Sequence, residues 1–239
     1  MFGRCVGRIR ERQAPSVVFR PGAPGVGQDN PPIKARPTDG GKGIDKFEKR
    51  PCIVVVPQGL KTARGEQGLG TAEDLNLLLQ HVKPTRPVDA RRIYLTGISP
   101  GGYGTWAWGP HDLPHFAAIA PIVGGTGREG AKAMTPDCAP WDAGRARIPV
   151  DALVGAPDTT APPDRSERMI AAIPKAGGKE AKLAFDPEEG QGAGRGRCRS
   201  GILRLDRSPR SATRHLNPRC SQPALAPRPA DSAQLPTIP

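Results

Sequence analysis

The chain has 239 residues, enough for one large α/β domain or for one domain with a tail. Its 30 glycines, 29 prolines and 4% aromatic residues predict low-complexity segments beside any folded part. The net charge is +12, of which residues 191–239 carry +7 from nine arginines and two aspartates. No apolar run approaches the roughly 20 residues of a membrane-spanning helix, so we expect no membrane partner.

The cysteines predict neither a disulfide framework nor a zinc site. They are odd in number and form no C-x-x-C pair, so we expect reduced thiols at Cys5, Cys52, Cys138, Cys198 and Cys220. The first twelve residues are basic and lack the apolar region of a secretory signal, so as it stands the chain is expected to be cytoplasmic. His111 and His115 have the i, i+4 spacing of metal ligands on a helix, but Pro110 and Pro114 favour a loop there, and we expect neither a metal nor another cofactor.

Residues 1–45 are poorly patterned, and within them only Val17-Val18-Phe19 is typical of a strand. The β-branched run Ile53–Val56 predicts a strand buried on both faces of a parallel sheet, with residues 17–19 beside it. Thr71 is the expected N-cap of a helix that Pro84 and Pro87 end. One face of this helix is apolar at i, i+3, i+4 and i+7, through Leu75, Leu78, Leu79 and Val82.

Alternating elements continue to about residue 190. We expect strands over 93–96, 117–123, 150–154 and 181–185, and helices over 102–108 and 164–173. This alternation predicts a doubly wound, mostly parallel α/β sheet. In such sheets functional groups gather at the carboxyl ends of the strands, which is where Ser99 and Asp158 fall.

Gly97-Ile98-Ser99-Pro100-Gly101 follows the strand at 93–96 directly. A strand feeding G-x-S-x-G and then a helix is the context of a nucleophile elbow, where a sharp turn exposes the serine hydroxyl. The next residue normally lends its backbone N–H to an oxyanion hole. Here that residue is Pro100, which has no N–H.

Several separated segments resemble the α/β-hydrolase superfamily: residues 92–99, 101–106, 116–122 and 158–163. Within the superfamily the segments resemble the peptidases and the phospholipase/carboxylesterase-like esterases related to dienelactone hydrolases. The resemblance implies an α/β-hydrolase fold and cleavage of an ester or amide by a Ser-Asp-His triad. It places the nucleophile at Ser99 and the acid at Asp158, and it implies that Gly22 and Ala23 supply oxyanion N–H groups.

The chain departs from this family pattern at three places. Pro100 stands where relatives carry Met or a similar residue, and Pro21 stands where a His-Gly loop is expected. The expected position of the catalytic histidine, shortly after the last strand, holds Gln191, which cannot act as a general base. His215 has the correct chain order after Ser99 and Asp158, and it is the remaining candidate base, although it lies in an arginine-rich segment.

The resemblance stops abruptly at Gln191. We therefore expect an irregular segment over 1–45, a hydrolase core over 46–190 and a disordered Arg/Pro-rich tail over 191–239. A frameshift or a sequence error at both ends would explain the loss of pattern. Without interleaved aromatics the tail predicts no specific nucleic-acid partner. Two functions stay open: a serine hydrolase acting on small esters or peptide-like substrates, impaired as it stands, and an inactive hydrolase-fold remnant with a basic tail.

Overall fold

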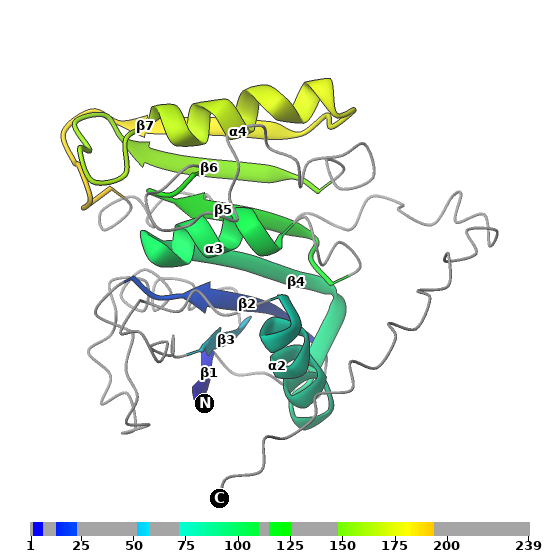
Figure 1. Cartoon of the computed structure of the whole chain (residues 1–239). Coiled ribbons are helices and arrows are strands. Elements are labelled where there is room, and N and C mark those ends of the chain that lie inside the picture. Colours follow the sequence, from blue (N-terminus) through cyan, green and yellow to red (C-terminus); the bar gives the residue numbers. More distant parts are fainter. Residues whose placement is uncertain are drawn as a thin grey trace, which may run out of the picture. The chain divides into compact units, whose positions relative to one another are not determined.

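The residues that the computed structural model describes contain a seven-stranded sheet in the order β1-β3-β2-β4-β5-β6-β7 (Figure 1). The described residues are 2–6, 13–22, 52–57, 72–109, 115–125 and 148–193. The strands are β1 (Phe2–Val6), β2 (Ala14–Arg20), β3 (Cys52–Val56), β4 (Val88–Ile98), β5 (Ala118–Ile122), β6 (Val150–Gly155) and β7 (Ala181–Asp186).

Strands β2 to β7 run parallel, and β1 alone is antiparallel, paired with β3. The predicted pairing of residues 17–19 with the strand at 53–56 is confirmed, since Val17 lies opposite Val54. The N-terminal segment differs from the irregular one expected, because it supplies two strands. The sequence of residues 14–16 does not by itself predict a strand. β2 lies between β3 and β4, and pairing with both neighbours holds these residues in the extended conformation.

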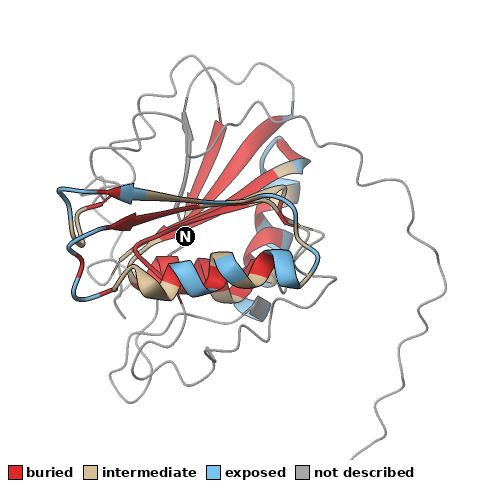
Figure 2. Cartoon of the chain, turned by 90° about the horizontal axis from the view of Figure 1, so that it is seen from above, coloured by how far each residue is buried: buried red, intermediate tan, exposed pale blue. Residues whose placement is uncertain are grey.

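The helices are α2 (Ala72–Thr85), α3 (Pro100–Trp108) and α4 (Asp164–Lys175), and both views place them on one side of the sheet (Figures 1 and 2). Their apolar side chains join one core cluster with the sheet, and the predicted face of α2 is confirmed as buried. α2 continues one residue past Pro84 and ends at Thr85. The Thr85 hydroxyl stabilises this end, because it donates to the carbonyl of His81 at 2.9 Å.

Burial is deepest in the middle strands of the sheet (Figure 2). The folded part also extends beyond the expected boundary at Gln191, because residues 191–193 form a turn and Ala193 is fully buried. The rest of the expected tail, residues 194–239, lies outside the described residues. Within the described ranges, no helix is both long and apolar enough to cross a bilayer.

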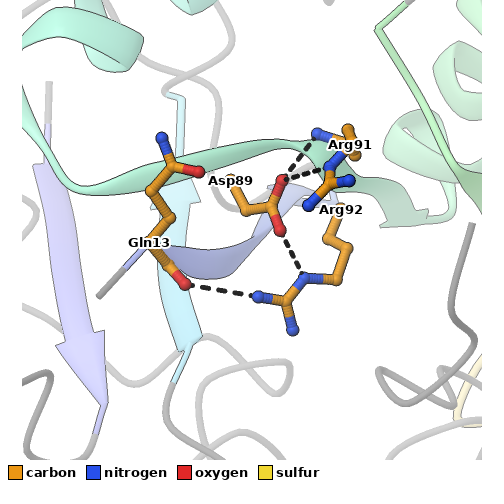
Figure 3. Close-up of polar contacts among 4 residues, drawn as sticks. All are labelled: Gln13, Asp89, Arg91 and Arg92. Carbon is orange, nitrogen blue, oxygen red and sulfur yellow. Dashed lines mark hydrogen bonds and ion pairs between the residues drawn. The ribbon is translucent and has the colours of Figure 1, made fainter.

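A polar cluster joins the start of β4 to the residue before β2 (Figure 3). The buried carboxylate of Asp89 accepts the Arg92 Nε–H at 2.7 Å and the Arg91 backbone N–H at 2.9 Å. Arg92 also donates to the carbonyl of Gln13 at 3.2 Å. Burial raises the pKa of Asp89, but these hydrogen bonds and the two arginine charges outweigh it, so the pKa lies below its ordinary value.

Candidate active site

Ser99 forms the turn between β4 and α3, as the G-x-S-x-G motif predicts. β4 ends at Ile98, α3 begins at Pro100, and Ser99 itself has φ 54° and ψ −119°. A positive φ is uncommon for a residue with a side chain and marks local strain. Its backbone is held on both sides: the Ser99 N–H donates to the Ile122 carbonyl at 3.0 Å, and the Ser99 carbonyl accepts the Tyr103 N–H at 3.0 Å.

Two glycines of the motif let the turn pack against the end of β2. A Cβ at Gly101 would collide with the Arg20 carbonyl, and a Cβ at Gly97 would lie 2.6 Å from the Arg20 Cβ. The motif therefore needs small residues here for close packing as well as for the turn. Arg20 is buried, and its guanidinium stacks 3.8 Å above the centre of the Trp108 ring. Burial lowers the pKa of Arg20 to about 9, and the charge of Asp74 opposes this.

Asp158 lies in the turn that follows β6 and is 4% exposed. Its Oδ1 accepts the backbone N–H groups of Thr160 and Ala161, each at 2.8 Å. Because β4, β5 and β6 are parallel, Ser99 and Asp158 lie at the same carboxyl edge of the sheet, as the sequence predicts.

Gln191 is the other partner of this carboxylate. Its Nε2 lies 3.2 Å from Asp158 Oδ1 and 3.1 Å from Oδ2, from a turn that comes five residues after β7. This is the place where the family resemblance expects a histidine to contact the acid. A carboxamide can donate to the carboxylate in the same way, but it is no base at neutral pH. The structure thus places Ser99 at a strained turn and surrounds the Asp158 carboxylate with two backbone N–H groups and the Gln191 amide.

The remaining predicted site residues are only partly described. Pro100 is the first residue of α3, so the N–H that would follow the nucleophile does not exist. Gly22 is half-buried and lies two residues beyond β2 at the same carboxyl edge, while Ala23 and His215 lie outside the described residues. Whether these residues act in catalysis stays a prediction.

The tryptophan and histidine side chains of this region have structural contacts. Trp106 and Trp108 are buried in the core cluster that α3 forms with the sheet. His115 Nδ1 lies 3.0 Å from the Lys83 ammonium, and His111 lies outside the described residues. Among the residues that the structure does describe, no group of three His, Cys, Asp or Glu side chains could hold a metal ion. Sequence reasoning did not single out Tyr103, Arg165 or Ser166, whose polar contacts join α3 to α4.

Solved structures with the same arrangement include a thermostable esterase, at 22% identity and TM-score 0.56. The alignment covers 77% of this chain and 50% of the esterase, so the chain spans about half of that protein's length. A proposed dienelactone hydrolase from Klebsiella pneumoniae has 17% identity and TM-score 0.56 over 79% of this chain and 80% of the other. An acylaminoacyl peptidase from Pyrococcus horikoshii has 18% identity and TM-score 0.54 over 80% of this chain and 35% of the other.

These similarities establish the fold: the chain has an α/β-hydrolase fold, as the family resemblance predicts. No protein-family model and no curated protein sequence matches the chain. At these sequence identities the shared fold does not establish a shared activity, because proteins with one fold can have many different functions.

Proposed function

We propose that this chain carries the site of a serine hydrolase of the carboxylesterase or peptidase type, with Ser99 as nucleophile and Asp158 as acid. The observation that carries the proposal is the strained turn at Ser99, at the same sheet edge as a buried carboxylate. Strain of this kind persists where the surrounding structure enforces it, and it is concentrated at functional sites. The substrates would be small esters or peptide-like amides, since the related structures include esterases and a peptidase.

The chemistry needs a base that this site does not contain among its described residues. Attack of Ser99 Oγ on a carbonyl carbon releases the hydroxyl proton, which a histidine oriented by the acid normally accepts. Gln191 occupies that place and cannot accept the proton. In addition to the missing base, the missing N–H at Pro100 should lower kcat by a factor on the order of 10²–10³. We therefore propose slow hydrolysis for the chain as it stands.

The test is hydrolysis of p-nitrophenyl acetate by the full chain and four variants. The unchanged chain should be barely faster than the Ser99→Ala variant. Gln191→His should raise kcat by about 10²-fold or more, because triad members act as a unit. Ser99→Ala in the Gln191→His background should remove the gain. His215→Ala tests the remaining candidate base, and we expect it to leave the rate unchanged.

Two outcomes would contradict this proposal. Ordinary enzyme rates in the unchanged chain that His215→Ala abolishes would make His215 the base. A Gln191→His variant that folds but stays inactive, with Ser99 unlabelled by a fluorophosphonate probe, would favour the second candidate, a hydrolase-fold remnant without chemistry. The observation behind that candidate is the Gln191 amide, which already satisfies both oxygens of the acid.

A further inference from the structure

Ser166 is a buried hydroxyl that joins three elements. It lies in the first turn of α4 and is 1% exposed. Its Oγ donates to the carbonyl of Gly124, which follows β5, at 2.9 Å. The same oxygen accepts the indole N–H of Trp106 on α3 at 3.3 Å. The Ser166 hydroxyl thus uses its one donor and one of its two acceptor lone pairs within the buried interior.

Both ends of this junction lead to the candidate active site. Gly124 comes two residues after Ile122, whose carbonyl accepts the Ser99 N–H. On the other side, Ser166 comes eight residues after Asp158 in a continuous turn-and-helix segment whose start is folded around that carboxylate. One connection between the two predicted triad positions therefore runs through this buried hydroxyl.

The backbone between the carbonyls of Ile122 and Gly124 is strained. Val123 has φ 43°, in the left-handed region that β-branched residues avoid, and it is fully buried. Its own N–H donates to the Leu153 carbonyl at 2.8 Å. Strain at such a residue persists only where neighbouring contacts enforce it. Here the contacts are the Ser99 N–H on the Ile122 carbonyl and the Ser166 hydroxyl on the Gly124 carbonyl.

We propose that Ser166 is a positioning residue that sets the spacing between Ser99 and Asp158. The proposal rests on the proposed function, because it assigns Ser166 a role in aligning that same site. A second link runs alongside it, since Arg165 Nη1 donates to the Tyr103 hydroxyl at 2.6 Å. Arg165 is partly exposed, so the dry and doubly bonded Ser166 supplies the more rigid connection.

The first measurement is amide hydrogen exchange, which needs no activity. In the full chain, Ser166→Ala should speed exchange by about tenfold at the Ser99 N–H and at the Thr160 and Ala161 N–H groups, because local opening of both turns becomes easier. Ser16→Ala is the matched control. The Ser16 hydroxyl in β2 is also buried, but within the described residues it has no hydrogen-bond partner, so its loss should leave these amides unchanged.

The second measurement is the steady-state kinetics of p-nitrophenyl acetate hydrolysis in the Gln191→His background. Ser166→Ala should lower kcat by about 10- to 100-fold and leave KM within about twofold, because misplacement of about 1 Å costs on this scale in rate. Ser16→Ala should change neither parameter.

The two measurements separate this proposal from the proposed function. If Gln191→His is inactive, the proposed function fails, and hydrogen exchange alone still decides whether Ser166 holds both turns. Unchanged exchange at either turn would overturn the role of Ser166. Exchange that accelerates equally in the sheet strands, or an equal effect of Ser16→Ala, would show general destabilisation and would overturn it as well.

Discussion

The side-chain amide of Gln191 donates to both carboxylate oxygens of Asp158, at 3.2 and 3.1 Å. A histidine at this position would use one ring nitrogen to contact the acid and would keep the second to accept a proton from serine. Glutamine has no second nitrogen. Asp158 thus has the contact that the family resemblance expects from a histidine, but the side chain that makes it has no nitrogen left to accept a proton.

Pro100→Met should help only when a base is present. In the unchanged chain we expect kcat for p-nitrophenyl acetate to change by no more than about twofold, because an oxyanion donor cannot deprotonate Ser99. In the Gln191→His background the restored N–H should add about 10²-fold to kcat. Equal gains in the two backgrounds would show that the N–H acts independently of the base.

Gly155→Ala should displace the turn that carries Gln191. A Cβ at Gly155 would collide with the carbonyl oxygens of Glu189 and Gly190, which are backbone atoms and cannot rotate away. We expect a loss of about 1–3 kcal/mol in the free energy of unfolding, measured by urea denaturation. In the Gln191→His background most of the gained activity should also disappear.

The control for this substitution is Gly190→Ala in the same turn. A Cβ there would meet its nearest neighbour, the Asp158 Cα, at 3.6 Å, which is ordinary van der Waals contact. Its unfolding free energy should stay within about 0.5 kcal/mol of the parent value. A Gly155→Ala variant as stable as Gly190→Ala would show that the turn moves at little cost.

Asp89→Asn should destabilise the chain in a pH-dependent way. The amide loses the charge-assisted bonds to Arg91 and Arg92, at a cost of about 1–3 kcal/mol near neutral pH. Because the pKa of Asp89 in the folded chain lies below its ordinary value of 3.8, the unfolded chain binds more protons at pH values between these two pKa values. The contribution is therefore complete above the ordinary pKa and is lost as pH falls through the folded pKa.

The measurement is denaturant unfolding of the parent and the Asp89→Asn variant at several pH values from neutral to acid. Their difference in unfolding free energy should shrink as the pH falls below about 4. The exposed pair of Asp164 and Arg168 provides a control, because Asp164→Asn should cost less than about 1 kcal/mol. A difference for Asp89→Asn that does not vary with pH would contradict the role of its charge.

The sequence by itself determined the part of the fold in which local pattern and tertiary context agree. The β-branched run at 53–56 and the i, i+3, i+4 pattern of α2 carry their own periodicity, and G-x-S-x-G after a strand specifies its turn. These elements appear with shifts of a few residues, and they place Ser99 and Asp158 at one edge. β1 and the start of β2 carry no such pattern, and only pairing with β3 and β4 makes them strands.

Only the tertiary structure decided what surrounds the two predicted triad positions. Sequence reasoning identified Gln191 at the position where the family resemblance expects a histidine. Its hydrogen bonds to Asp158, however, depend on how the turn after β7 packs against the turn after β6. Likewise, Ser166 and Gly124 are 42 residues apart in the chain, and nothing local predicts that their atoms meet. Such contacts arise from packing between elements, which residue spacing along one element does not encode.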